Sequence, residues 1–213
     1  MSTKMAIDAH DVLLVIDIQN DFLPGGALPV AGSDAIAPLV NRLIKCFTQV
    51  VVTQDWHPEG HVSFASSHDG AKPFDVVQFP HGDQALWPDH CVQGAPGAAL
   101  HEALDVDSAC LILRKGVNAK IDSYSAFTEA DGKTTTGLAA LLKARGVRRV
   151  FACGLATDYC VAYSALDARA AGFETFVVDD ACRAIDAGGS LEAAWAKMNS
   201  AQVWRIQARE ILG

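Results

Sequence analysis

Three polar side chains, Asp17, Lys115 and Cys160, each follow closely on an apolar stretch of strand length. A cysteine thiol can act as a nucleophile, an aspartate can take its proton, and an ammonium group can stabilise the charges that form. Cys160 also follows a glycine-containing turn that begins at Gly154, and we expect it to lie in the first turn of the helix that comes next. The partial positive charge and free amides of such a turn, with Lys115 nearby, favour the thiolate and could bind an oxyanion.

Each of these side chains also has an ordinary structural explanation. Free cysteine is among the most buried residue types, so Cys160 could be a packing residue. Asp17 could be a solvated loop carboxylate, and Lys115 could be an exposed lysine at the end of a strand. The prediction of cysteine catalysis therefore depends on all three residues following strands together.

A second group of polar residues is formed by Asp55, His57, His61 and His90. A carboxylate and an imidazole two residues apart can face one ion, and a distant histidine can complete the set. Nitrogen and oxygen ligands of this kind suit Zn²⁺ or Fe²⁺. The spacing alone is a weak motif, since each histidine could equally lie in a surface loop.

The apolar pattern predicts the scaffold that holds these residues. Continuous apolar runs, typical of strands buried on both faces, occur at Val12–Asp17, Val50–Thr53, Cys110–Leu113, Arg149–Gly154, Thr175–Asp179 and Val203–Ile206. Helical stripes occur at Ser33–Phe47, Thr136–Arg145, Asp158–Ala171 and Leu191–Met198. This alternation predicts an α/β fold with a parallel sheet and helices on both faces, which binds ligands beyond the carboxyl ends of its strands.

The length of 213 residues predicts a single domain over residues 1–213. Residues 55–109 interrupt the alternation with a loop-rich stretch. A stretch of this length in a compact domain is usually functional, so we interpret it as an insertion that binds the metal and the substrate.

Composition and charge exclude several classes of function. The net charge is -8 and no basic cluster is present, which argues against nucleic acid and anionic membranes as partners. The apolar runs are too short to span a membrane, and Met1–His10 has no apolar signal-peptide core. Six cysteines without a C-x-x-C pair fit a reduced, cytoplasmic protein. Motifs of serine hydrolases, P-loop enzymes and dinucleotide-binding proteins are absent from the sequence.

Six motifs occur in the order found in one known family: Asp17–Phe22, Gln54–His57, Trp87–Cys91, Lys115–Gly116, Asp122–Phe127 and Gly154–Cys160. Together they resemble the nicotinamidase/pyrazinamidase family of isochorismatase-like cysteine hydrolases. The resemblance implies a three-layer α/β/α fold with a six-stranded parallel sheet. It also implies that the chain is an amidohydrolase that converts nicotinamide to nicotinate and ammonia through a cysteine thioester, with pyrazinamide as a further substrate.

The resemblance assigns roles to the first group of polar residues and to the ring-binding positions. Asp17, Lys115 and Cys160 correspond to the family's catalytic triad. The rings of Phe22, Trp87 and Tyr124 occupy positions that wall the substrate ring. The peptide bond before Ala156 is cis in the family, and the amides of Ala156 and Cys160 face the oxyanion.

The resemblance further implies one divalent metal ion, Zn²⁺ or Fe²⁺ with Mn²⁺ as a third option, held by Asp55, His57 and His90. In the family the metal takes the pyridine nitrogen of the substrate. Some members carry an additional ligand after the first histidine. Here that position offers His61 or Ser63, and the sequence does not choose between them.

Two other functions are compatible with parts of the sequence. A related hydrolase could cleave another amide, a carbamoyl group or a vinyl ether, but the metal residues disfavour vinyl-ether cleavage, which needs no pyridine anchor. A binding module without catalysis is disfavoured by the intact Asp, Lys and Cys. The expected partner is the small-molecule substrate alone. The sequence leaves open the native metal, the preference between nicotinamide and pyrazinamide, and whether a homo-oligomer forms.

Overall fold

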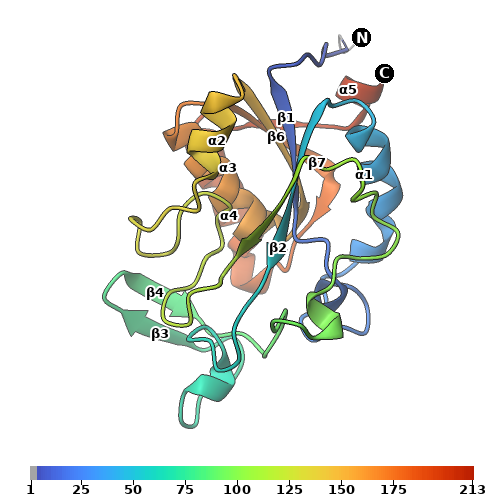
Figure 1. Ribbon diagram of the computed structural model, residues 1–213. Coiled ribbons are helices and arrows are strands. Elements are labelled where there is room, and N and C mark those ends of the chain that lie inside the picture. The colour runs from blue at the N-terminus through green and yellow to red at the C-terminus, as the bar shows by residue number, and fades with distance from the viewer. Residues whose placement is uncertain (1–3) are drawn as a thin grey trace.

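The centre of the molecule is a six-stranded sheet in the order β5-β2-β1-β6-β7-β8 (Figure 1). The structure is a computed structural model that describes residues 4–213. Met1–Thr3, part of the segment predicted to lack a signal peptide, lie outside the described residues. Every neighbouring pair of strands in the sheet is parallel. The strands are β1 (Asp11–Ile16), β2 (Gln49–Asp55), β5 (Leu111–Lys115), β6 (Arg149–Leu155), β7 (Glu174–Arg183) and β8 (Trp204–Ile206).

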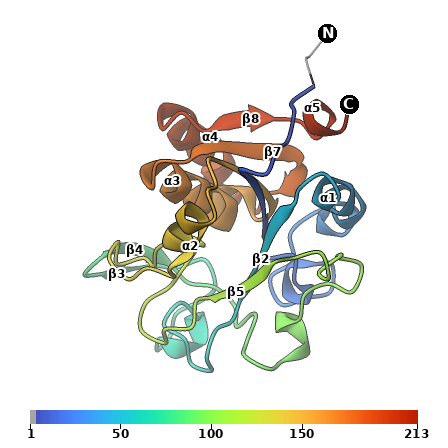
Figure 2. The same ribbon diagram turned by 45° about the horizontal axis from the view of Figure 1, so that its top comes forward.

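Helices cover both faces of this sheet and produce three layers. α1 and α5 lie on one face, and α2, α3 and α4 lie on the other (Figure 2). The helices are α1 (Ala37–Ile44), α2 (Leu138–Ala144), α3 (Ala162–Ala170), α4 (Ser190–Ser200) and α5 (Arg209–Leu212). The arrangement confirms the predicted α/β/α fold with a six-stranded parallel sheet.

The central strands are mainly apolar because both of their faces are covered. All six residues of β1 are buried, and β6 leaves only Arg149 partly exposed. The two strands approach closely at Gly154, which has a φ of 119° and where a Cβ atom would lie 2.1 Å from the carbonyl oxygen of Ile16. Because only glycine fits there, the strand that leads to Cys160 can lie directly beside the strand that leads to Asp17.

Several element boundaries differ from the prediction. A short 3-10 turn, Ser33–Ala35, precedes α1, which has a proline in its first turn. The helix predicted from Asp158 begins as a π-helical turn, Thr157–Val161, and continues as α3. β5 runs on to Lys115, two residues beyond the predicted end, because the buried lysine is held by ion pairs that an apolar pattern cannot reveal.

The loop-rich stretch at residues 55–109 contains only short elements. Most of it lies beyond the carboxyl ends of the sheet strands (Figure 1). It includes an antiparallel hairpin, β3 (Val76–Phe79) and β4 (Gly82–Ala85), which the sequence pattern did not predict. Across residues 4–213, no helix has the length and apolarity needed to cross a membrane.

Candidate active site

The ends of β1, β5 and β6 bring Asp17, Lys115 and Cys160 into contact. Nζ of Lys115 lies 2.9 Å from Oδ2 of Asp17 and 3.3 Å from Sγ of Cys160. The exposed fractions of the three residues are 0%, 1% and 6%, in the order Asp17, Lys115, Cys160. Asp17 is therefore not a solvated loop carboxylate, and Lys115 is not an exposed lysine at a strand end. The three residues lie together, as predicted.

Thr53, on β2, orients the Asp17 carboxylate. The Thr53 hydroxyl donates to Oδ1 of Asp17 over 2.6 Å and accepts from the Asp17 backbone N–H over 3.2 Å. Oδ2 has the Lys115 ammonium beside it but receives no well-aligned hydrogen bond from the described residues. This oxygen is therefore the one that is open to a proton. Sequence reasoning missed Thr53, although its place at a strand end beside Asp55 was a usable signal.

Burial decides the protonation state of this group. It raises the pKa of Asp17 to about 6, against the opposing effect of Lys115. It also raises the pKa of the Cys160 thiol well above its usual range, and Lys115 opposes this only in part. Lys115 favours the thiolate, as expected, but burial outweighs its effect. At neutral pH the pair is a thiol and a carboxylate, so Asp17 must take the proton before the sulfur can attack.

Lys115 remains a cation although it is buried. Burial by itself lowers the pKa of Lys115, but the carboxylates of Asp17 and Asp55 outweigh it and hold the pKa well above its usual range. Nζ donates to Oδ1 of Asp55 over 2.5 Å and to the carbonyl oxygen of Ser123 over 3.0 Å. The ammonium group thus lies between the thiol on one side and the second group of polar residues on the other.

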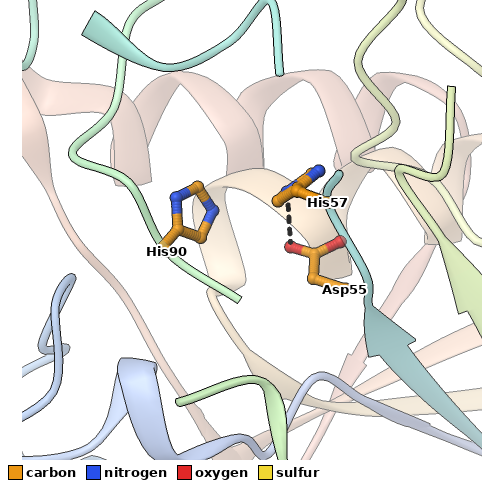
Figure 3. Close-up of side chains that lie close together, drawn as sticks. All are labelled: Asp55, His57 and His90. Atoms are coloured by element: carbon orange, nitrogen blue, oxygen red, sulfur yellow. Dashed lines mark ion pairs between the residues drawn. The ribbon is translucent and has the colours of Figure 1, made fainter. Parts of the chain in front are cut away.

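Asp55, His57 and His90 converge as a candidate metal site (Figure 3). One potential ligand atom from each lies within 4.8 Å of the others, and all three residues are buried. Nδ1 of His57 lies 3.0 Å from the carbonyl oxygen of Gly116, and Nδ1 of His90 lies 2.8 Å from that of Pro88. A carbonyl oxygen only accepts, so each Nδ1 carries the proton and each Nε2 is left with the lone pair that a metal requires.

His57, His61 and His90 are all buried, so none of them is an exposed surface-loop residue. His61 lies beside His57. The centroids of the His57 and His61 rings are 4.3 Å apart. Nδ1 of His61 contacts the Ser63 hydroxyl at 2.7 Å, while its Nε2 is buried without a hydrogen-bond partner among the described residues. His61 forms a second potential ligand set with His57 and Asp122, and His57 also belongs to the set that contains Asp55 and His90.

A pocket lies above the thiol and beside the metal residues. Its lining is mainly aromatic and aliphatic, and consists of Phe22, Leu28, Asp55, His57, Trp87, His90, Asp122, Tyr124, Ala156, Tyr159, Cys160 and Ile185. The three predicted ring-binding residues are all present. The peptide bond between Leu155 and Ala156 is cis, as the resemblance implies.

Sequence reasoning missed four residues of this pocket: Leu28, Asp122, Tyr159 and Ile185. Asp122 and Tyr159 lie within motifs that carried the resemblance, so their neighbours Tyr124 and Cys160 were a usable signal. Leu28 and Ile185 come from loops distant in the sequence, and no pattern indicated them. Ile185 is held in place by Asp158, whose carboxylate accepts from the Ile185 backbone N–H over 3.1 Å.

A parallel α/β sheet with a buried cysteine, aspartate and lysine at its strand ends is the arrangement of a cysteine hydrolase. The model of the isochorismatase domain family matches residues 11–210. The chain therefore belongs to the isochorismatase family. Within it the chain groups with the nicotinamidases, since a nicotinamidase from Acinetobacter baylyi is 56% identical over 200 residues, 94% of each chain.

Solved structures agree with this assignment. A nicotinamidase/pyrazinamidase from Acinetobacter baumanii has a TM-score of 0.94 and 51% identity, covering 95% of this chain and 98% of that one. A protein from L. infantum, solved with nicotinate, has a TM-score of 0.86 and 39% identity, covering 98% of both chains. The pyrazinamidase of Pyrococcus horikoshii, solved with zinc, has a TM-score of 0.75 and 38% identity over 93% of this chain and 99% of its own.

Proposed function

We propose that this protein hydrolyses nicotinamide to nicotinate and ammonia through a thioester on Cys160, and that pyrazinamide is a second substrate. The observation that carries the proposal is the buried group of Asp17, Lys115 and Cys160 at the base of an aromatic pocket. Its chemistry suits a primary amide, which needs a nucleophile for the carbon and a proton for the departing nitrogen.

In the first half of the reaction, Oδ2 of Asp17 takes the thiol proton while Sγ of Cys160 bonds to the carboxamide carbon. The carbonyl oxygen gains the electron pair and is stabilised by the backbone amides of Ala156 and Cys160. When the carbonyl re-forms, the carbon–nitrogen bond breaks. Asp17 returns its proton to the nitrogen, which leaves as ammonia, and the acyl group stays on sulfur as a thioester.

In the second half, Asp17 takes a proton from water while the water oxygen bonds to the thioester carbon. The carbon–sulfur bond then breaks, and the sulfur recovers a proton from Asp17. Nicotinate is released and the thiol is restored. Lys115 neutralises part of the negative charge on the aspartate and the sulfur in both halves.

The pocket walls place the carboxamide over the sulfur. Phe22, Trp87 and Tyr124 offer apolar ring surface, to which Leu28 and Ile185 add aliphatic contacts. Trp87 and Tyr159 are packed edge to face, with centroids 4.8 Å apart and an interplanar angle of 88°. A flat aromatic ring of pyridine size fits such a pocket better than a flexible aliphatic amide would.

Asp55, His57 and His90 are the proposed ligands of one divalent ion, Zn²⁺ or Fe²⁺ with Mn²⁺ as a third option. The donor set fits, because two neutral imidazole nitrogens and a carboxylate suit these ions. When bound, the ion supplies a Lewis acid for the pyridine nitrogen of the substrate. We propose His61 and not Ser63 as the additional ligand, because the Ser63 hydroxyl is engaged with His61 while Nε2 of His61 has no partner among the described residues.

Residues 1–213 are proposed to form one hydrolase domain, with residues 55–109 as its metal- and substrate-binding insertion. The test of the function is ammonia release from nicotinamide by protein loaded in turn with zinc, iron and manganese. Turnover by wild type and its loss in Cys160→Ala are expected. If no metal supports ammonia release, or if Cys160→Ala is as active as wild type, the proposal is refuted.

A further inference from the structure

The β3–β4 hairpin carries one buried residue of strand β4 toward the pocket. Gln84 is 2% exposed, whereas its neighbours Gly82 and Asp83 are exposed. The facing strand is also open to solvent, since Val76 is 64% exposed. A polar side chain buried from an otherwise exposed hairpin must be satisfied by specific partners, and those partners indicate what the hairpin holds.

The amide nitrogen of Gln84 has three oxygen neighbours. Nε2 lies 2.8 Å from Oδ2 of Asp122, 2.9 Å from the hydroxyl of Tyr124 and 2.8 Å from the carbonyl oxygen of Ala85. The amide has two protons, so these three acceptors share them. The opposite orientation of the amide would place its oxygen against the Asp122 carboxylate, which fixes the nitrogen on this side.

The same tyrosine hydroxyl also accepts from Trp87. Nε1 of Trp87 lies 2.9 Å from it, and the two rings are perpendicular at an interplanar angle of 89° with centroids 6.3 Å apart. Both rings and the Asp122 carboxylate line the pocket. Gln84 does not line it, but one hydroxyl connects Gln84 to both of these aromatic walls.

We infer that Gln84 is a positioning residue that fixes the Tyr124 and Trp87 rings as one wall of the pocket, with Asp122 as its anchor. For its effect on catalysis this inference rests on the proposed function. Removing the Gln84 amide leaves the buried Asp122 carboxylate and the Tyr124 hydroxyl each short of a donor. The tyrosine is then free to rotate toward other partners, and the wall loses its defined geometry.

The first experiment tests the Trp87–Tyr124 hydrogen bond directly and does not depend on turnover. It compares Gln84→Leu with Gln78→Leu, a matched control on the same hairpin whose side chain is exposed and bonds to Asp83 at the surface. The indole N–H signal of Trp87 in ¹H–¹⁵N spectra, assigned by its loss in Trp87→Phe, reports the hydrogen bond to Tyr124. We expect Gln84→Leu to shift this signal and speed its hydrogen exchange, and Gln78→Leu to leave both unchanged. An unchanged signal in Gln84→Leu refutes the inference.

The second experiment separates positioning from general damage. In Gln84→Leu we expect KM for nicotinamide to rise about tenfold, with kcat changed less than about threefold. Alkylation of Cys160 by iodoacetamide, which has no ring to position, keeps its wild-type rate. An equal fall in turnover and alkylation, or an unchanged KM, overturns the inference. If wild type itself does not hydrolyse nicotinamide, the proposed function fails, while the indole signal still decides the role of Gln84.

Discussion

The two halves of this site are built differently. The catalytic group, Asp17, Lys115 and Cys160, follows strands whose backbones are fixed by parallel ladders. The binding group, His57, His90, Trp87 and Tyr124, comes from loops outside the sheet, and hydrogen bonds of the side chains themselves orient its rings. The difference indicates that the chemistry is tied to the fold, whereas substrate choice is tied to loops that can change without disturbing the sheet.

The halves meet at the end of β5. Lys115 bonds to Asp55, a proposed metal ligand, and approaches Asp17 and Cys160 in the catalytic group. The next residue, Gly116, accepts a hydrogen bond from His57. Changes confined to one half should therefore have separable effects, and changes at this junction should affect both.

The largest expected effect is that of Cys160→Ala. Turnover of nicotinamide should fall at least ~10³-fold, because the substitution removes the nucleophile, while binding of nicotinamide stays nearly unchanged. Steady-state kinetics and calorimetric titration measure the two quantities. Cys46→Ala, at an exposed cysteine, is the matched control and should retain activity. Residual activity of Cys160→Ala within about tenfold of wild type would show that the thioester mechanism is wrong.

Asp17→Asn keeps the shape of the side chain and removes the base. We expect kcat to fall ~10²-fold or more, with little change in the binding of nicotinamide. Activity at neutral pH close to that of wild type would mean that Asp17 is only a structural carboxylate.

The same residue predicts the pH dependence of wild type. Asp17 must be unprotonated to accept the thiol proton, and burial raises its pKa to about 6, with Lys115 opposing and Asp55 reinforcing that shift. The value of kcat/KM should therefore rise as the pH increases through about 6 and fall below it. A profile that stays flat from well below this pH to neutrality would contradict the assignment of Asp17 as the base.

Metal removal tests the binding group alone. Chelation, or His57→Ala, should weaken nicotinamide binding and lower kcat by up to ~10²-fold, because a misplaced carboxamide no longer meets the sulfur. Alkylation of Cys160 should continue, since Asp17 and Lys115 are intact. Benzamide, which lacks the ring nitrogen, should be a poor substrate that gains nothing from metal. If metal accelerates benzamide and nicotinamide equally, it acts on the carbonyl or on water, and the division between the two halves is wrong.

The smallest expected effect is that of a substitution at the end of β5, where the catalytic and binding groups meet. Gly116 has a φ of 66°, and a Cβ atom there would lie 2.4 Å from Cε1 of His57. Gly116→Ala should displace the imidazole and weaken metal binding about tenfold, as measured by competition with a chromogenic chelator. Gly137→Ala is the control, because Gly137 also has a positive φ, of 86°, but open space around it. Equal losses in both variants would attribute the effect to backbone strain and not to His57.

Much of the fold could be predicted because the buried strands are continuous apolar runs. Val12–Asp17 was predicted as a strand, and the structure places β1 at Asp11–Ile16. The hairpin was not predictable in the same way, because strand β4 reads Gly-Asp-Gln-Ala and has no apolar alternation. Its one buried residue is a glutamine, whose burial depends on partners that are distant in the sequence.

The same limit applies to the site. That strand ends meet at one edge of a parallel sheet is a general rule, so the convergence of Asp17, Lys115 and Cys160 could be predicted. The protonation of Cys160 could not, because it depends on how deeply the thiol is buried. Ile185 could not be predicted either, since its place in the pocket is set by a bond to Asp158, 27 positions earlier in the chain.

The position of β5 at the edge of the sheet has a consequence for partial unfolding. Among residues 4–213, β5 is paired with β2 alone, and Ile112, its second residue, is 46% exposed. Edge strands with little buried surface open at a lower free energy than central strands. Opening of β5 withdraws the Lys115 ammonium from the thiol and the Gly116 carbonyl from His57 in one event. The molecule would then lose catalysis and metal retention while β1, β6 and β7 were still folded, so activity is a more sensitive reporter of fraying than the sheet itself.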